Sequence, residues 1–139
     1  MEAVSTVDRW IFAWCSLTQR ARRWQGQLKD TLQPHELSAV ELLVLWRTGH
    51  AASPGISQVE LSRELSVSAA QVCGVVETLH GRGWVQTTRP AEDRRRLYCQ
   101  LTPAGNVELQ RLRSALLPMA QRCLRDDPAM PSVNLEEAA

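Results

Sequence analysis

Residues 57–81, SQVELSRELSVSAAQVCGVVETLHG, decide the fold of this 139-residue chain. Ser57-x-x-Glu60 has the form of a capping box, in which the hydroxyl and the carboxylate pair with backbone N–H groups at the start of a helix. Residues 66–68 break the helical pattern, and the second helix ends near Gly81 and Gly83, a residue type favoured just past helix ends. Two short helices joined by a tight turn form a helix-turn-helix pattern.

Two predicted strands follow this pattern, at residues 84–89 and 97–101. The seven residues between them, PAEDRRR, are too polar for a core and suit the tip of a hairpin. Thr102 then caps a further helix, with Pro103 at its first position, where a missing N–H costs nothing. The sequence therefore predicts a mainly α fold with a small β-hairpin, a winged helix-turn-helix.

Long helices flank this winged segment on both sides. The first, residues 7–30, has an apolar seam with helical 3-4 spacing, and the last, residues 103–125, has a second seam in which Pro118 is expected to interrupt and kink the helix. Between the first helix and residue 57, Ser38-x-x-Glu41 predicts another capped helix and residues 49–55 predict a loop. Packing within the chain and packing on a partner chain both fit the seams, which consist of Val7, Trp10, Trp14, Leu17, Ala21, Trp24 and Leu28, and of Leu109, Leu112, Leu116, Met119 and Cys123.

Charge is distributed unevenly along the chain. The total of 16 basic and 15 acidic residues gives a net charge of +1, which argues against binding nucleic acid by bulk attraction. Residues 31–81 hold two arginines and five glutamates, a balance of −3, whereas residues 82–96 hold five arginines against Glu92 and Asp93, a balance of +3. Lys29 is the only lysine. The hairpin is therefore the place where the chain would attract an anion.

Several classes of protein are disfavoured by what the sequence lacks. No apolar run reaches the ~20 residues of a transmembrane helix, and the N-terminus does not read as a signal peptide, so a cytoplasmic location is expected. The four cysteines form no Cys-x-x-Cys pair and are expected to be buried or half-buried. His35, His50 and His80 do not cluster as metal ligands, and no catalytic motif or cofactor site is expected.

The chain resembles the MarR family of winged helix-turn-helix transcription regulators over about residues 7–125. The motifs that carry the resemblance are LSREL at 61–65, residues 68–79, GWV at 83–85, DRR at 93–95 and LTPAG at 101–105. The resemblance implies a homodimer on double-stranded DNA, built from one domain over residues 1–127: dimerisation helices at 7–30 and 103–125, and a DNA-binding lobe at 35–101. Residues 128–139 are expected to be a flexible tail. Relatives often carry a further C-terminal helix, which is not evident here.

The resemblance also implies which residues meet DNA. The second helix of the pattern, residues 69–79, would enter the major groove, where Gln71 can pair with adenine. Gln71 has an alternative role in closing a capping box on Ser68. Arg95 would enter the minor groove, held in place by a charge-assisted hydrogen bond that the carboxylate of Asp93 accepts. The full set comprises Ser68, Ala70, Gln71, Gly74, Thr78, Arg89, Asp93, Arg94, Arg95 and Arg96, with Arg89, Arg94 and Arg96 as phosphate contacts.

The resemblance also implies a dimer interface and a regulatory site. The interface would contain Val7, Trp10, Trp14 and Leu17 of the first helix, and Leu109, Leu112, Leu116 and Met119 of the last. A small anionic or aromatic effector would bind near Trp14, Trp24 and Trp46. Two alternatives remain open: a redox-sensing regulator that uses Cys15, and a winged-helix adaptor that binds protein instead of DNA.

Overall fold

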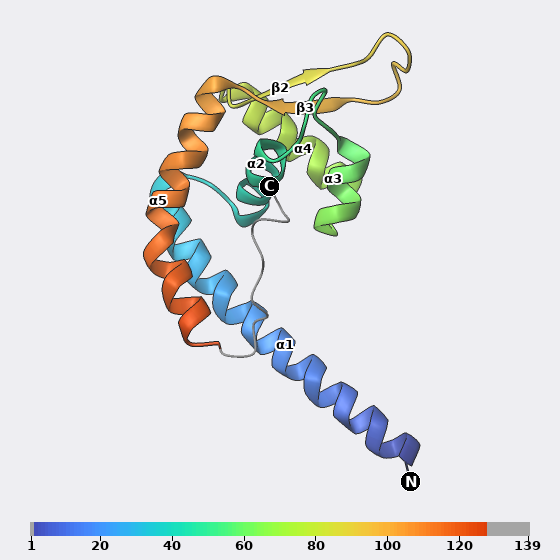
Figure 1. Cartoon of the computed structure of the whole chain (residues 1–139), viewed down its shortest axis with the longest axis vertical. Helices are drawn as coiled ribbons and strands as arrows, with labels where there is room; N and C mark the ends of the chain where they lie inside the picture. Colours follow the sequence, from blue (N-terminus) through green and yellow to red (C-terminus); the bar gives the residue numbers. More distant parts are fainter. Residues whose placement is uncertain (1, 128–139) are drawn as a thin grey trace.

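The structure is a computed structural model, and it describes residues 2–127. Figure 1 shows a winged helical lobe at one end and two long helices that run away from it. The predicted winged helix-turn-helix class is confirmed, whereas the tail predicted at residues 128–139 lies outside the described residues. In chain order the elements are α1 (Glu2–Leu32), the short 3-10 helix η1 (Gln33–His35), α2 (Ala39–Gly49), β1 (Ile56–Ser57), α3 (Gln58–Leu65), α4 (Ala69–Gly81), β2 (Val85–Thr88), β3 (Tyr98–Leu101) and α5 (Pro103–Arg125).

Side-chain hydrogen bonds cap the N-termini of the helices in the winged lobe. Ser57 and Glu60 form the predicted capping box at α3, with the two hydrogen bonds at 3.1 and 3.0 Å. Thr102 Oγ1 accepts a hydrogen bond from the N–H of Gly105 at the start of α5. At Ser38 only half of the predicted box forms: the hydroxyl accepts from the N–H of Glu41, but Oε2 of Glu41 is buried and has no hydrogen-bond partner among residues 2–127.

The hairpin belongs to a three-stranded antiparallel sheet rather than standing alone. The strand order is β1-β3-β2, with Ile56 opposite Cys99 and Val85 opposite Leu101. The sequence predicts β2 and β3 but not β1, because a strand of two residues has no alternation to detect. The extra strand ties the start of α3 to the stem of the wing.

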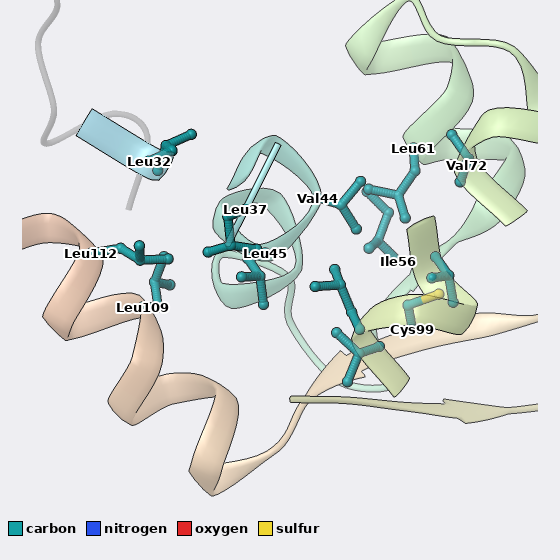
Figure 2. Packing of buried hydrophobic residues seen from close by; sticks show 13 residues of the cluster. Leu32, Leu37, Val44, Leu45, Ile56, Leu61, Val72, Cys99, Leu109 and Leu112 are labelled. Atoms are coloured by element: carbon teal, nitrogen blue, oxygen red, sulfur yellow. The ribbon is translucent and has the colours of Figure 1, made fainter. Parts of the chain in front are cut away.

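One hydrophobic core joins α2, α3, α4, the sheet and the upper part of α5. Figure 2 shows Leu109 and Leu112 of α5 lying toward Leu37 and Leu45. Leu109 and Leu112 are 2% and 0% exposed within this single chain, so their predicted place in a dimer interface is wrong. A helical seam marks a buried face, but it does not say which partner covers that face.

The lower part of α5 packs antiparallel on the C-terminal half of α1. Thr31 lies beside Met119, Gln27 beside Cys123, and Arg20 forms an ion pair with Asp127. The helix continues through Pro118 and is not interrupted there. Ser114, whose carbonyl loses its helical partner at this proline, is exposed and open to water. The first half of α1 projects beyond this contact (Figure 1).

No helix in the described residues is long and apolar enough to cross a membrane.

Candidate nucleic-acid interface

Helix α4 presents one apolar face to the core and one open face to solvent. Val72, Val76 and Leu79 are buried and Val75 is half-buried, as the helical spacing predicts. The turn before α4 contains Ser66 in the left-handed conformation, which lets the chain reverse within three residues. The expected DNA contacts of this helix are all exposed: Ser68, Ala70, Gln71, Gly74 and Thr78.

Ser68 caps α4, and Gln71 is left free to face outward. The Ser68 hydroxyl accepts from the backbone N–H of Gln71 at 3.2 Å. Within the described residues the Gln71 amide makes no return bond to Ser68, so the alternative role as a capping-box residue is not realised. Thr78 differs, because its hydroxyl donates to the Gly74 carbonyl at 3.0 Å. Gln71 is therefore the main hydrogen-bonding side chain on this face.

Gly74 leaves an open step in the same face. A Cβ placed on this residue would meet nothing within 4 Å. Because Gly74 has no side chain, another surface can approach the backbone of α4 closely here, but this position cannot read a base.

The wing tip is held together by its own backbone and by Asp93. The Asp93 carboxylate accepts a hydrogen bond from the backbone N–H of Arg95 at 3.1 Å and faces the guanidinium of Arg96 at 3.7 Å. The prediction that Asp93 holds the guanidinium of Arg95 is therefore wrong. An aspartate commonly bonds the backbone two residues ahead in a turn, and this local bond takes the carboxylate instead.

Two of the predicted phosphate contacts also brace the wing. Arg89 donates from Nη1 to the Arg94 carbonyl at 2.9 Å, which links the end of β2 to the tip. Hydrogen bonding to Tyr98, followed by the nearby charges of Tyr98 and Asp93, raises the pKa of Arg96. Arg89 and Arg96 therefore both help to position the tip.

Arg94 and Arg95 are the arginines of the tip whose guanidinium groups are unengaged within residues 2–127. Both side chains are exposed, and they belong to the loop between β2 and β3, which projects from the lobe (Figure 1). The wing thus separates arginines that hold its shape from arginines that are available to a ligand.

The stem of the wing lies next to α4. A cavity of about 400 Å³ is lined by Cys73 and Glu77 of α4, and by Thr87 and Arg89 of the wing. The helix and the wing therefore border one continuous surface.

Arg82 positions the elements around it, a role that its sequence context does not indicate. It donates from Nη2 to the Glu36 carbonyl at 2.8 Å and lies over the Trp84 ring, 5.1 Å from its centroid. Arg82 thereby links the segment after α1 to the last turn of α4 and the start of the wing. Its place two residues before a tryptophan is too common a pattern to have revealed this.

The three tryptophans expected around an effector do not share one pocket. Trp24 lines an apolar cavity of about 420 Å³ between α1 and α5. Trp14 is exposed and stacked on Trp10, and Trp46 packs beside His50. Trp14 and Trp46 do not line that cavity, because they lie on the projecting half of α1 and on α2.

A second cavity lies at the junction of α1 and the winged lobe. It measures about 540 Å³ and lies where α1, η1 and α2 meet. Lys29 and Glu36 are among its lining residues, which also include Gln25, Gln33, Leu37, Ser38 and Ala39.

The cysteines divide into two exposed and two buried thiols. Cys15 and Cys73 are exposed, which contradicts the expectation that all four are at least half-buried, and Cys99 and Cys123 are buried. Burial raises the pKa of Cys99 to about 11. Within residues 2–127, no three histidine, cysteine or acidic side chains gather as a metal site.

The expected interface residues of α1 and the lower part of α5 remain available to a partner. Val7, Trp10, Trp14 and Leu17 are exposed on α1. Leu116 packs partly on the core, and Met119 is half-buried against Thr31.

Two helices joined by a tight turn and followed by a β-hairpin define the class of winged helix-turn-helix proteins, and α3, α4 and the β2–β3 hairpin have this arrangement. Residues 35–96, which contain α3, α4 and most of the hairpin, match the sequence profile of the MarR family.

Solved structures share the fold over most of the chain. The transcriptional regulator BldR from Sulfolobus solfataricus is 22% identical, with a TM-score of 0.77 over 94% of this chain and 89% of its own. A probable transcriptional regulator from Pseudomonas aeruginosa is 27% identical, with a TM-score of 0.68 over 87% and 86%. BpsR from Bordetella bronchiseptica, whose DNA binding is regulated by 6-hydroxynicotinic acid, is 20% identical. Its TM-score is 0.64 over 87% of this chain and 83% of its own. No curated protein matches the sequence.

Proposed function

We propose that this chain is a DNA-binding transcription regulator that acts as a homodimer on a two-fold symmetric operator. The observation that carries the proposal is the exposed outer face of α4, next to the stem of a wing whose tip carries Arg94 and Arg95, with guanidinium groups unengaged within residues 2–127. The match of residues 35–96 to the sequence profile of the MarR family supports the same role. The role is regulatory rather than catalytic, and repression is the sign that the family resemblance favours.

In this proposal α4 lies in the major groove. The Gln71 amide pairs with the edge of an adenine, and the Ala70 methyl group contacts a thymine methyl group. Gly74 lets the helix backbone approach closely but reads no base. Direct readout by α4 is therefore limited to a few positions, and the protein depends on the wing for the rest.

The wing supplies the minor-groove contact. Arg95 enters the groove, where a narrow A·T tract has enhanced negative potential, and Arg94 contacts the flanking phosphates. Arg89 and Arg96 hold the tip and add positive charge near the backbone. Because the rest of the winged segment is acidic, the arginine-rich wing accounts for most of the attraction to DNA.

An effector would act from the cavity between α1, η1 and α2. Lys29 offers a positive charge in that cavity, which suits a small organic anion. The compound that regulates DNA binding by BpsR, 6-hydroxynicotinic acid, is a small organic anion of this kind. A ligand that displaces Glu36 would disturb the Glu36–Arg82 bond, and through Arg82 the end of α4 and Trp84 at the start of the wing.

Selection of bound fragments from random duplex DNA tests the proposed function. The full chain is expected to enrich a site with two half-sites related by two-fold symmetry, because a symmetric dimer places its recognition helices about one helical turn apart. Failure to enrich any sequence would contradict the proposal and favour the protein-binding adaptor instead.

A further inference from the structure

Glu77 places a negative charge on the open face of α4. It is exposed and lies seven residues after Ala70 and three after Gly74, so the three residues share one side of the helix. The buried side lies opposite and consists of Val72, Val76 and Leu79. Glu77 is the one acidic residue in the sequence of α4. The surface that we propose to meet the major groove therefore carries a carboxylate.

No contact in the fold accounts for this carboxylate. Glu77 makes no hydrogen bond or ion pair within residues 2–127. On a helix, a charged side chain usually pairs with a residue three or four positions away, and here these residues are Cys73, Gly74, His80 and Gly81. The helix dipole favours a carboxylate only near the start of a helix, whereas Glu77 is one turn from the end of α4. The charge therefore adds nothing to the stability of the helix.

Glu77 lies on the side of α4 that faces the wing. It lines the cavity of about 400 Å³ together with Thr87 and Arg89 of the stem of the wing. Arg89 does not neutralise it, because its guanidinium donates to the Arg94 carbonyl and forms no ion pair with Glu77 in the described part of the chain. The carboxylate is thus unpaired at the border between the two elements that we propose to contact DNA.

A carboxylate against DNA has two effects. The phosphates repel it, which lowers the affinity for every sequence. In the major groove it can accept a hydrogen bond from the 4-amino group of cytosine, whereas guanine and thymine present acceptors that repel it, and adenine presents an acceptor beside its amino group. Because a Cβ on Gly74 would meet nothing within 4 Å, α4 can approach the bases closely enough for the Glu77 side chain to reach them.

We propose that Glu77 is a specificity-determining residue that accepts a hydrogen bond from the 4-amino group of one cytosine in each half-site. The inference rests on the DNA-binding function proposed above and adds a cytosine to the adenine assigned to Gln71. At a site without this cytosine, the carboxylate loses water and gains no donor, so the wrong sequence is penalised. The arginines of the wing supply attraction to any DNA, and Glu77 supplies discrimination.

A change of preference at one base position tests this assignment. Selection from random duplex DNA is carried out with the full chain and with Glu77→Gln, which keeps the length of the side chain and removes its charge. The wild type should select cytosine at one position of each half-site. The variant should select adenine there, because an amide pairs with both N6 and N7 of adenine, and the other positions should keep their base preferences.

Affinity measurements give a second readout. Glu77→Gln should bind random duplex DNA more tightly than the wild type, because it removes a repulsive charge. Its discrimination between the wild-type site and a site with thymine in place of the cytosine should fall about fivefold to a hundredfold, the range of one mismatched base pair. Asp30→Asn is the matched control: it removes one negative charge from an exposed position on α1 and should keep the wild-type base preferences.

The outcomes separate this inference from the proposed function. Identical base preferences for the wild type and Glu77→Gln would overturn the inference and leave the proposed function intact. A loss of preference spread evenly over all positions would also overturn it, because that loss would indicate a structural role for Glu77. A wild type that selects no sequence would overturn both the inference and the proposed function.

Discussion

At the scale of single residues, the wing assigns different tasks to neighbouring arginines. Arg89 and Arg96 are engaged in the structure of the hairpin, whereas the guanidinium groups of Arg94 and Arg95 have no partner within the described residues. The sequence DRRR does not distinguish these roles. The hydrogen bonds distinguish them. They single out Arg95 for a test of DNA recognition and Asp93 for a test of the shape of the wing.

Arg95→Ala is expected to weaken binding to the selected operator by about 1–3 kcal/mol, the range of a good base-reading contact. A gel-shift titration measures the change. Arg111→Ala is the matched control, because this arginine is 73% exposed on α5 and removes the same charge away from the wing. Equal losses in the two variants would show that Arg95 contributes only general charge.

Asp93→Ala separates positioning from electrostatics. Removing the carboxylate adds one positive charge, which should leave affinity for random duplex DNA unchanged or higher. Loss of the bond to the Arg95 backbone should nevertheless weaken operator binding by about 1 kcal/mol.

Asp126→Ala makes the same charge change at a carboxylate that is 77% exposed just after the end of α5, and it should not weaken operator binding. If Asp93→Ala behaved like this control, the carboxylate would have no positioning role.

At the scale of elements, the junction between the wing and α5 depends on one close approach. A Cβ on Gly105 would lie 2.1 Å from the Trp84 carbonyl oxygen, so the first turn of α5 packs directly on the backbone before β2. Gly105→Ala should therefore lower the free energy of unfolding by about 1–3 kcal/mol, measured by denaturant titration followed by circular dichroism.

Gly26→Ala provides the comparison for this junction. Gly26 is also within a helix, but a Cβ there would meet nothing within 4 Å. Alanine should stabilise that position by about 0.5–1 kcal/mol. Similar stability changes in the two variants would contradict the account of the α5 junction.

The elements were largely predictable from local chemistry, and their partners were not. The capping box at Ser57 and the cap at Thr102 follow from side chains that bond backbone groups within three residues. Strand β1 depends on pairing with the distant β3, which no local pattern records.

The seams and the aromatic residues show the same limit. Leu109 and Leu112 share their helical spacing with Met119, yet the first two enter the core of their own chain. Trp14, Trp24 and Trp46 share chemistry but lie in three separate environments. Periodicity predicts that a side chain is covered, whereas tertiary structure decides what covers it.

At the scale of the whole molecule, charge and apolar surface are sorted into different regions. The positive charge gathers in the wing of a chain whose net charge is only +1. The uncovered apolar surface gathers on the projecting half of α1, at the opposite end of the molecule (Figure 1). The surface proposed to contact DNA is therefore separate from the uncovered apolar surface.

The salt dependence of binding to random duplex DNA tests the central claim most directly. A dimer that contacts about three phosphates per protomer should lose a thousandfold or more in affinity between about 50 and 200 mM salt. Replacing Arg94 and Arg95 together by alanine should flatten that slope. Affinity that does not change with salt, or the absence of binding at about 50 mM salt, would contradict the assignment of this surface to DNA.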